Sequence, residues 1–121
     1  MINIERFFLH NLAVDITDTV SQEEIFRRIA RALVSAGVIS DPTALVEELK
    51  EREKLGSTGV GSGIALPHVI SSNILKPAVM VLRLKKPLEW YSIDNKPVKL
   101  IVVLVAPEKD RNLYLTLLAE V

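Results

Sequence analysis

Two apolar runs near the carboxyl end of the chain place the strongest limit on its fold. They are 78-AVMVLRL-84 and 98-VKLIVVLV-105, both rich in β-branched residues, and a last helix is predicted after them from near Asp110. Apolar character that is nearly continuous, rather than alternating with polar residues, is typical of strands covered on both faces. The runs therefore predict an α/β fold in which a β-sheet is layered with α-helices.

A helix start signal follows a short strand predicted at residues 13–16. Residues 21-SQEE-24 form a capping box in which Ser21 is the N-cap and Glu24 is the third residue after it. Gly37 supplies the left-handed residue that commonly ends a helix. The apolar residues between these two signals recur at helical spacing and predict one buried face: Ile25, Ile29, Ala32, Leu33 and Ala36.

A second helix is predicted to begin with Asp41 as N-cap and Pro42 in its first turn. Leu45 and Leu49 lie on one face of this helix, and Arg52 takes the next position along the same stripe. An arginine on an otherwise buried stripe either reaches solvent at the edge or directs its charge at a binding partner.

The composition limits the class of protein. The chain has 121 residues, of which 49% are hydrophobic, enough for one domain with a real core. Its formal net charge of zero gives no general attraction to nucleic acid or to an anionic membrane. Cysteine is absent, which fits a reducing compartment, and we expect a cytoplasmic protein. The longest apolar run, Leu100 to Ala106, is far shorter than the roughly 20 residues of a membrane helix, so we expect no membrane insertion.

The stretch 55-LGSTGVGSGIALPHVI-70 holds four of the five glycines of the chain and one of its two histidines. Residues 63–66 are predicted to form a strand, which places His68 at the carboxyl end of a strand. Loops at the carboxyl ends of strands are where α/β folds bind ligands. Pro67 restricts the backbone directly before the histidine.

Several familiar motifs do not fit this glycine-rich stretch. A phosphate-binding P-loop requires a lysine where Ser62 stands, and the dinucleotide fingerprint requires a glycine where Ile64 stands. Neither serine of the stretch has the flanking glycines of a nucleophile elbow. The two histidines are isolated in the sequence, so we expect no metal site, and no cofactor is indicated.

A histidine that acts as a nucleophile or base remains compatible with the pattern. Neutral imidazole has a lone pair available at physiological pH and can accept and release a phosphoryl group. The hydroxyls of Ser57 and Thr58, the backbone around Gly59 and the guanidinium of Arg52 are candidate partners for the charge on that group. Each of these residues also has an ordinary structural interpretation. His68 suits a surface or hydrogen-bonded position, Ser57 and Thr58 suit a turn, and Arg52 suits solvent.

The string 51-EREKLGSTGVGSGIALPH-68 resembles the signature of the enzyme IIA components of the sugar phosphotransferase system, in the fructose–mannitol class. That signature consists of Arg-Glu, a Ser-Thr-Gly, a glycine-interspersed stretch and an Ile-Ala-Ile/Leu-Pro-His. The segments 76-KPAVMVLRLKKPLEW-90 and 98-VKLIVVLVAPE-108 are similar to the later strands of the family and its Ala-Pro-Glu loop. The resemblance covers nearly the whole chain.

This resemblance implies a fold, an activity and partners. It implies that residues 1–121 form a single type-2 IIA domain with a mixed β-sheet between α-helices, lacking the family's last C-terminal helix. A histidine phosphocarrier protein would donate a phosphoryl group to His68, which would pass it to a IIB component, with Arg52 as the charge partner. Ser57, Thr58 and Gly59 match the family's Ser-Thr-Gly and are inferred to bind the phosphoryl group, without metal or cofactor.

One departure and one alternative accompany the resemblance. Many members carry a second histidine where Tyr114 aligns, and a phenol donates a hydrogen bond but carries no proton at neutral pH. The phrase REKLGSTGVG is especially similar to nitrogen-related IIA proteins, which regulate transporters and kinases by binding. A regulatory or transporter-appended IIA module is therefore the alternative to a sugar carrier, and a free-standing hydrolase is a distant third possibility.

Overall fold

The computed structural model describes residues 14–18, 20–90 and 94–120. The predicted α/β fold is confirmed: one sheet is combined with α-helices, with two helices after the first strand and a third after the last. The elements are β1 (Val14–Ile16), α1 (Gln22–Ser35), α2 (Pro42–Leu55), β2 (Gly59–Gly61), β3 (Ile64–Ala65), β4 (His68–Ile70), β5 (Ala78–Leu88), β6 (Val98–Ala106), the 3₁₀ helix η3 (Glu108–Asp110) and α3 (Arg111–Glu120). The strand β2 was not predicted, because a glycine-rich stretch lacks the apolar alternation that signals a strand.

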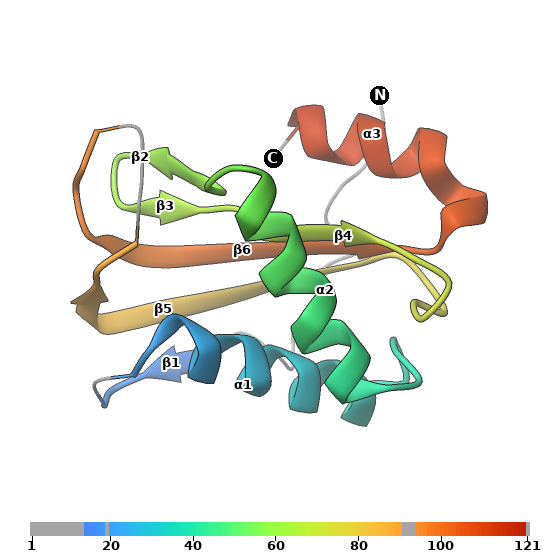
Figure 1. Cartoon of the computed structure of the whole chain (residues 1–121), viewed down its shortest axis with the longest axis horizontal. Helices are drawn as coiled ribbons and strands as arrows, with labels where there is room; N and C mark the ends of the chain where they lie inside the picture. Colours follow the sequence, from blue (N-terminus) through green and yellow to red (C-terminus); the bar gives the residue numbers. More distant parts are fainter. Residues whose placement is uncertain (1–13, 19, 91–93, 121) are drawn as a thin grey trace.

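The two long apolar runs form the centre of one six-stranded sheet (Figure 1). The strands β5 and β6 pair antiparallel, whereas β1 runs parallel to β5 and β3 runs parallel to β6. The strand β2 completes one end as the antiparallel partner of β3, and β4 also pairs with β6. The sheet is therefore mixed, as the resemblance implied.

The strands β3 and β4 lie one after the other along the same edge of β6. Ile64 is opposite Leu100 and His68 is opposite Leu104, so both strands keep one register. Pro67 has no N–H to offer a ladder, but its carbonyl accepts a hydrogen bond of 3.0 Å from the Leu104 N–H. The expectation that His68 lies at the carboxyl end of a strand is corrected: the strand resumes in register after Pro67, and His68 is its first residue.

Both predicted helix starts are confirmed. The Ser21 hydroxyl accepts from the Glu24 N–H at 3.1 Å, and the Asp41 carboxylate accepts from the Ala44 N–H at 3.2 Å. Gly37 follows α1 with a φ of 73°, in the left-handed region. These caps supply partners for N–H groups that have none within the helix.

The sheet separates two hydrophobic clusters. On one face, α1 and α2 pack against the sheet through residues such as Phe26, Leu33 and Leu49. On the other face, Tyr114 and Leu117 of α3 pack with β5 and β6 residues and form a smaller cluster. In Figure 1, α2 crosses in front of the sheet and α3 lies beside β4 and β6. The strand β4 thus lies between α2 and α3.

Candidate functional site

The structure brings together His68 and Arg52, which are sixteen residues apart in the sequence. Arg52 lies in the last turn of α2, and His68 is the first residue of β4. The Arg52 Nε donates to the His68 Nε2 over 3.2 Å, and the Arg52 Nη1 donates to the Gly56 carbonyl over 2.8 Å. The guanidinium is therefore held both by the end of its own helix and by the imidazole.

The two nitrogens of the His68 ring have different partners. Nδ1 lies 2.7 Å from the carbonyl oxygen of Leu66, which accepts hydrogen bonds and donates none. The proton of the neutral ring is therefore on Nδ1, and the lone pair is on Nε2, where Arg52 donates. The imidazole presents a nucleophilic nitrogen toward the guanidinium.

The pKa of His68 is lowered from the ordinary value of 6.5. Partial burial is the main cause, and the positive charge of Arg52 acts in the same direction. The Leu66 carbonyl and the negative charge of Glu53 oppose the shift, because both favour the protonated ring. The neutral, nucleophilic form therefore predominates at neutral pH.

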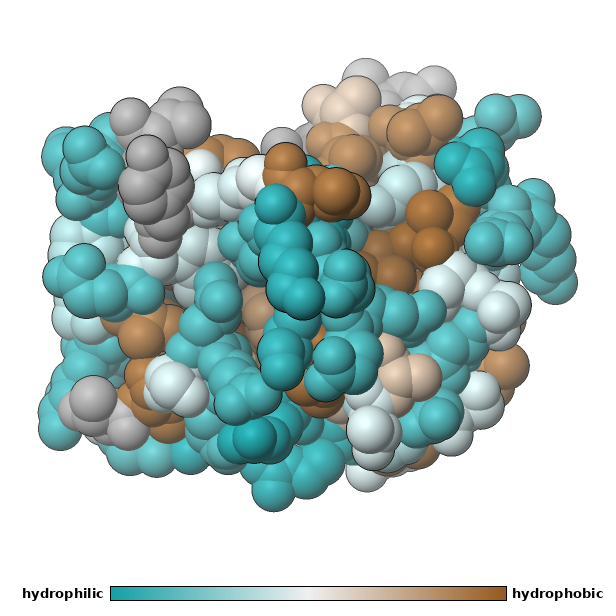
Figure 2. All heavy atoms as spheres, viewed as in Figure 1, coloured by the Kyte–Doolittle hydropathy of each residue, from teal (hydrophilic) through white to brown (hydrophobic). Residues whose placement is uncertain are grey.

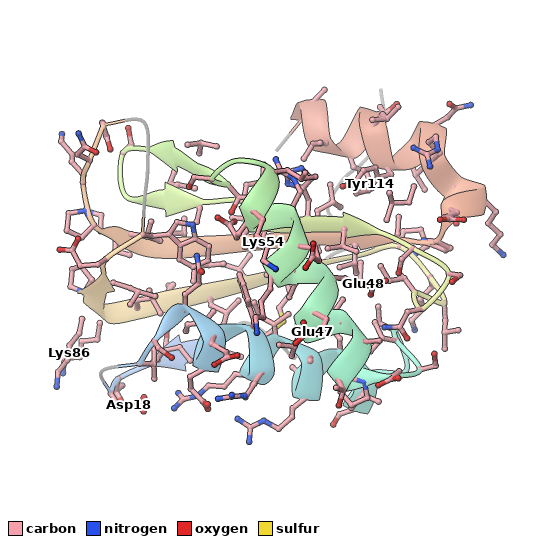
Figure 3. The ribbon with its side chains drawn as sticks, viewed as in Figure 1. Asp18, Glu47, Glu48, Lys54, Lys86 and Tyr114 are labelled. Carbon is pink, nitrogen blue, oxygen red and sulfur yellow. The ribbon has the colours of Figure 1, made fainter. Side chains whose placement is uncertain are left out.

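A groove of about 470 Å³ opens beside His68, between α2, β4 and α3. Figure 2 shows apolar surface between α2 and α3, and Figure 3 shows Glu48 of α2 and Tyr114 of α3 on the two sides of this space. Carboxylates and apolar groups both line the groove, which is formed by Glu47, Glu48, Glu51, Arg52, Leu55, His68, Val69, Ile70 and Tyr114. At its edge, Leu55 is 85% exposed. The site is therefore open to another molecule.

Tyr114 lies next to the histidine. The two ring centroids are 6.2 Å apart and the ring planes are inclined by 45°. Tyr114 is only 6% exposed, and this burial raises the pKa of its phenol to about 12. The positive charges of Arg52 and Arg111 oppose that shift only in part. The hydroxyl therefore remains a hydrogen-bond donor throughout the neutral range.

The predicted phosphoryl-binding residues Ser57, Thr58 and Gly59 lie between α2 and β3, outside the groove lining. The Ser57 hydroxyl accepts from the Gly59 N–H at 3.0 Å. The N–H of Thr58 donates to the Glu53 carboxylate at 3.2 Å, and the Thr58 hydroxyl donates to the same carboxylate. Thr58 is 3% exposed. Its donors are thus engaged by Glu53, and a contact between these residues and a phosphoryl group stays a prediction.

Glu53 was not among the sequence candidates, although it follows Arg52 directly. Its carboxylate reaches Thr58 across the turn that ends α2, where Gly56 has a φ of 150°. The Arg-Glu pair of the motif could have indicated Glu53 as a site residue. The hydrogen-bond partner of Glu53, however, depends on the shape of that turn. Through these hydrogen bonds to Thr58, the Glu53 carboxylate holds the loop between α2 and β2 against the end of α2.

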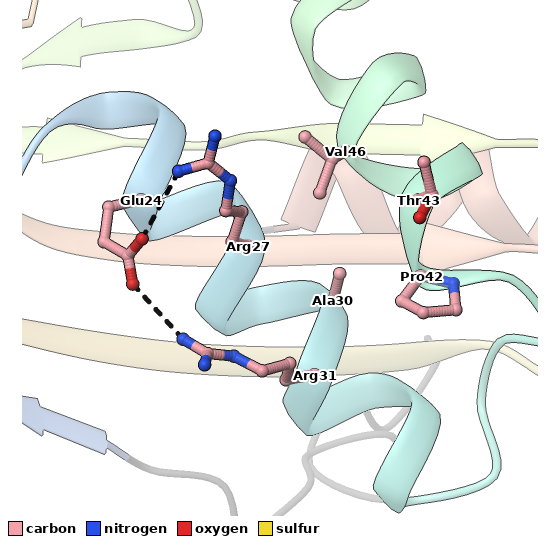
Figure 4. A pocket seen from close by; sticks show the side chains of 7 residues that line it. All are labelled: Glu24, Arg27, Ala30, Arg31, Pro42, Thr43 and Val46. Carbon is pink, nitrogen blue, oxygen red and sulfur yellow. Dashed lines mark hydrogen bonds and ion pairs between the residues drawn. The ribbon is translucent and has the colours of Figure 1, made fainter.

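A second cavity lies between α1 and the start of α2 (Figure 4). Its cationic groups are Arg27 and Arg31, which form ion pairs with Glu24 at 3.5 and 3.2 Å. Within residues 14–18, 20–90 and 94–120, no group of three or more His, Cys, Asp or Glu side chains is arranged to hold a metal ion. None of the helices in this described part of the chain is long and apolar enough to span a membrane.

Comparison with known proteins identifies related sequences. Residues 7–121 match the family described as "Phosphoenolpyruvate-dependent sugar phosphotransferase system, EIIA 2". A fructose-specific EIIABC component of the phosphotransferase system from Mycoplasma pneumoniae is 34% identical over 99% of the chain, which spans 17% of that protein. A nitrogen regulatory protein from Pseudomonas aeruginosa is 37% identical over 84% of the chain, which spans 66% of that protein.

A solved structure shares the fold. The crystal structure of the nitrogen regulatory protein IIA-Ntr from Neisseria meningitidis superimposes with a TM-score of 0.85 at 28% sequence identity. The match covers 97% of this chain and 80% of that one. Sequence and fold thus indicate the same group of relatives, which includes both a sugar-specific protein and nitrogen regulatory proteins.

Proposed function

The chain belongs to the EIIA 2 family of the phosphoenolpyruvate-dependent sugar phosphotransferase system, and we propose that it carries a phosphoryl group on His68. The observation that carries this proposal is the arrangement around the imidazole. Nδ1 is bonded to the Leu66 carbonyl, and Nε2 faces the guanidinium of Arg52 at the groove. A nucleophilic lone pair and a fixed positive charge are what transfer of an anionic phosphoryl group requires.

The transfer is a displacement at phosphorus. The Nε2 lone pair of His68 forms a bond to the phosphorus of an incoming phosphohistidine as the bond from phosphorus to the donor nitrogen breaks. The donor ring leaves with that electron pair, and the proton of the His68 ring stays on Nδ1, hydrogen-bonded to the Leu66 carbonyl. Arg52 turns from Nε2 toward the phosphoryl oxygens, where its charge stabilises the group in transit.

Tyr114 is the third group that we assign to this reaction, after His68 and Arg52. Its ring lies beside His68, and its hydroxyl has no hydrogen-bond partner among the described residues. A phenol that stays protonated donates a hydrogen bond to a phosphoryl oxygen without contributing a titration of its own. Tyr114 aligns with the position at which the family resemblance implies a second histidine.

We assign the donor and the recipient from the family. The donor is a histidine phosphocarrier protein, and the recipient is a IIB component, in accord with the fructose-specific EIIABC relative. The exposed groove around His68 fits transfer between proteins, because two imidazoles have to approach one phosphorus.

Intact-protein mass spectrometry tests the proposal. The chain is incubated with phosphoenolpyruvate, enzyme I and the histidine phosphocarrier protein, beside His68→Ala and a known IIA protein as a positive control. We expect one acid-labile phosphoryl adduct on the wild type and none on the variant. Equal labelling of His68→Ala would refute the assignment of His68, and an unlabelled wild type beside a labelled control would refute the carrier function.

Regulation of a partner by binding is the second candidate function. The nitrogen regulatory relatives in sequence and structure favour it, and so does a tyrosine at the second-histidine position. In this case a transporter or kinase would bind the chain without taking the phosphoryl group. A partner captured equally by the wild type and by His68→Ala would support this function, whereas capture that requires phosphorylation would argue for phosphate-dependent signalling.

A further inference from the structure

We propose that Glu53 is a positioning residue that acts through Thr58 and Leu66 to fix the tautomer and orientation of the His68 ring. This inference rests on the proposed function, since it concerns which nitrogen of His68 is free to react. It also changes the expected role of Thr58, from a contact with the phosphoryl group to a support of the imidazole.

A continuous series of hydrogen bonds connects Glu53 to His68. The Glu53 carboxylate accepts from the N–H of Thr58 at 3.2 Å and from its hydroxyl. The Thr58 carbonyl accepts from the Leu66 N–H at 2.9 Å. The Leu66 carbonyl then accepts from Nδ1 of His68 at 2.7 Å. The hydrogen bonds thus run without a break from the Glu53 carboxylate to the imidazole of His68.

The end of α2 therefore acts on both nitrogens of the imidazole. Arg52 donates directly to Nε2, while Glu53, the next residue, reaches Nδ1 through Thr58 and Leu66. Thr58 is buried, so water cannot readily replace its bonds to the carboxylate if the carboxylate is removed. Loss of Glu53 would leave buried donors on Thr58 and loosen the segment between β3 and β4 that carries the Leu66 carbonyl.

The position of the proton matters because only the unprotonated nitrogen is a nucleophile. A free neutral imidazole side chain in water favours the tautomer with its proton on Nε2. The bond from Nδ1 to Leu66 reverses this preference, together with the donation from Arg52 to Nε2, and leaves Nε2 with its lone pair. A displaced Leu66 carbonyl would return the proton to Nε2 in a large share of the molecules and make that share unreactive.

Four variants test this inference. Glu53→Gln and Thr58→Val weaken or remove the bonds at the carboxylate, Thr58→Ser retains the hydroxyl, and Glu23→Gln makes the same chemical change on α1, where Glu23 pairs with Lys50. The measurements are the ¹⁵N chemical shifts of the His68 ring, which report its tautomer, and the initial rate of phosphorylation by the histidine phosphocarrier protein. Amide NMR spectra show whether each variant is folded.

We expect Glu53→Gln and Thr58→Val to move the ¹⁵N shifts toward the tautomer protonated on Nε2. The rate of phosphorylation should fall about two- to fivefold, in proportion to the population of the reactive tautomer. Thr58→Ser should restore both measurements, and Glu23→Gln should leave both unchanged. Wild-type shifts in Thr58→Val, alongside a lowered free energy of unfolding, would show that the Glu53–Thr58 pair only stabilises the fold and would overturn the inference.

The two measurements separate this inference from the proposed function. If the wild type accepts no phosphoryl group, the proposed function fails, but the ¹⁵N shifts of the four variants still test whether Glu53 fixes the tautomer. If the wild type is phosphorylated and the shifts do not respond to Glu53→Gln or Thr58→Val, the carrier function stands and this inference fails.

Discussion

The rings of His68 and Tyr114 lie 6.2 Å apart and form adjacent parts of the same groove wall, although they come from β4 and α3. The histidine offers a lone pair, and the tyrosine offers a hydroxyl that stays protonated because burial raises its pKa to about 12. This pairing of a nucleophile with a donor that does not titrate leads to the first prediction.

Tyr114→Phe keeps the ring and removes the hydroxyl, so we expect a slower transfer with little change in the fold. The loss should be roughly tenfold, as for one hydrogen bond of about 1.5 kcal/mol to a charged group. Tyr114→His should instead add an inflection to the pH profile near the histidine pKa of about 6.5. Initial phosphorylation rates between about pH 6 and 9 measure both effects. A wild-type rate for Tyr114→Phe would exclude the hydroxyl from the reaction.

The pH dependence of stability follows from the lowered pKa of His68, of which burial is the main cause. Since the pKa is lower in the folded state than in the unfolded state, the unfolded chain binds the proton more readily. The stabilising contribution is therefore complete above the unfolded pKa of about 6.5 and is lost as the pH falls through the folded pKa. Urea unfolding at several pH values should show a steeper acid loss for the wild type than for His68→Gln. Equal slopes would contradict this.

Arg52→Lys keeps the charge but loses the planar geometry that lets one guanidinium donate to both His68 and Gly56. We expect Arg52→Lys to retain part of the transfer rate and Arg52→Ala to lose roughly 100-fold, as for removal of one electrostatic stabiliser. Phosphorylation rates of the two variants measure this. Because the positive charge of Arg52 lowers the pKa of His68, an NMR titration should also give a higher pKa in Arg52→Ala. Indistinguishable rates for both variants and the wild type would contradict the role of the guanidinium.

Two glycines with left-handed backbone conformations allow a matched test of how an added Cβ affects the stability of the fold. Gly37 has a φ of 73° and nothing within 4 Å of an added Cβ, whereas at Gly63, with a φ of 77°, the added atom lies 3.1 Å from the Lys99 side chain. Gly37→Ala should cost about 1–2 kcal/mol from backbone strain alone. Gly63→Ala should cost more, because Lys99 must also shift.

The double variant Gly63→Ala/Lys99→Ala tests the steric part of this difference. Chemical denaturation gives the free energy of unfolding of the double variant and of Lys99→Ala alone. The difference between these two should be close to the free energy that Gly37→Ala costs the wild type. A cost for Gly63→Ala that is unchanged in the Lys99→Ala background would assign the whole effect to the backbone.

Much of the fold was predictable because its signals are local. The caps at Ser21 and Asp41 and the two apolar runs each depend on neighbouring residues, and the structure confirms them. The proximity of Arg52 to His68 was expected from the motif and from the apolar stripe of α2. In contrast, β4 was not predicted as a strand, because a proline ordinarily interrupts the ladder and only pairing with β6 shows that the register continues.

The support of the imidazole could not be predicted in the same way. Glu53 reaches Thr58 through a turn whose shape depends on Gly56, and Thr58 reaches His68 only because β2 and β3 fold back as a hairpin. These contacts are set by backbone conformation, and no spacing rule in the sequence describes them. The hydroxyl of Thr58 therefore suggested a ligand contact from the sequence, whereas in the structure it bonds to a carboxylate.

His68 is the first residue of a strand that pairs with β6, so the sheet fixes the backbone orientation of the histidine. A reactive side chain on a mobile loop loses conformational entropy at every encounter with a partner. Here the backbone of the histidine is ordered once, when the sheet forms, and the same arrangement serves every later encounter. Evolution of new partners can therefore alter the rim of the groove while the reacting atom keeps its place in the sheet.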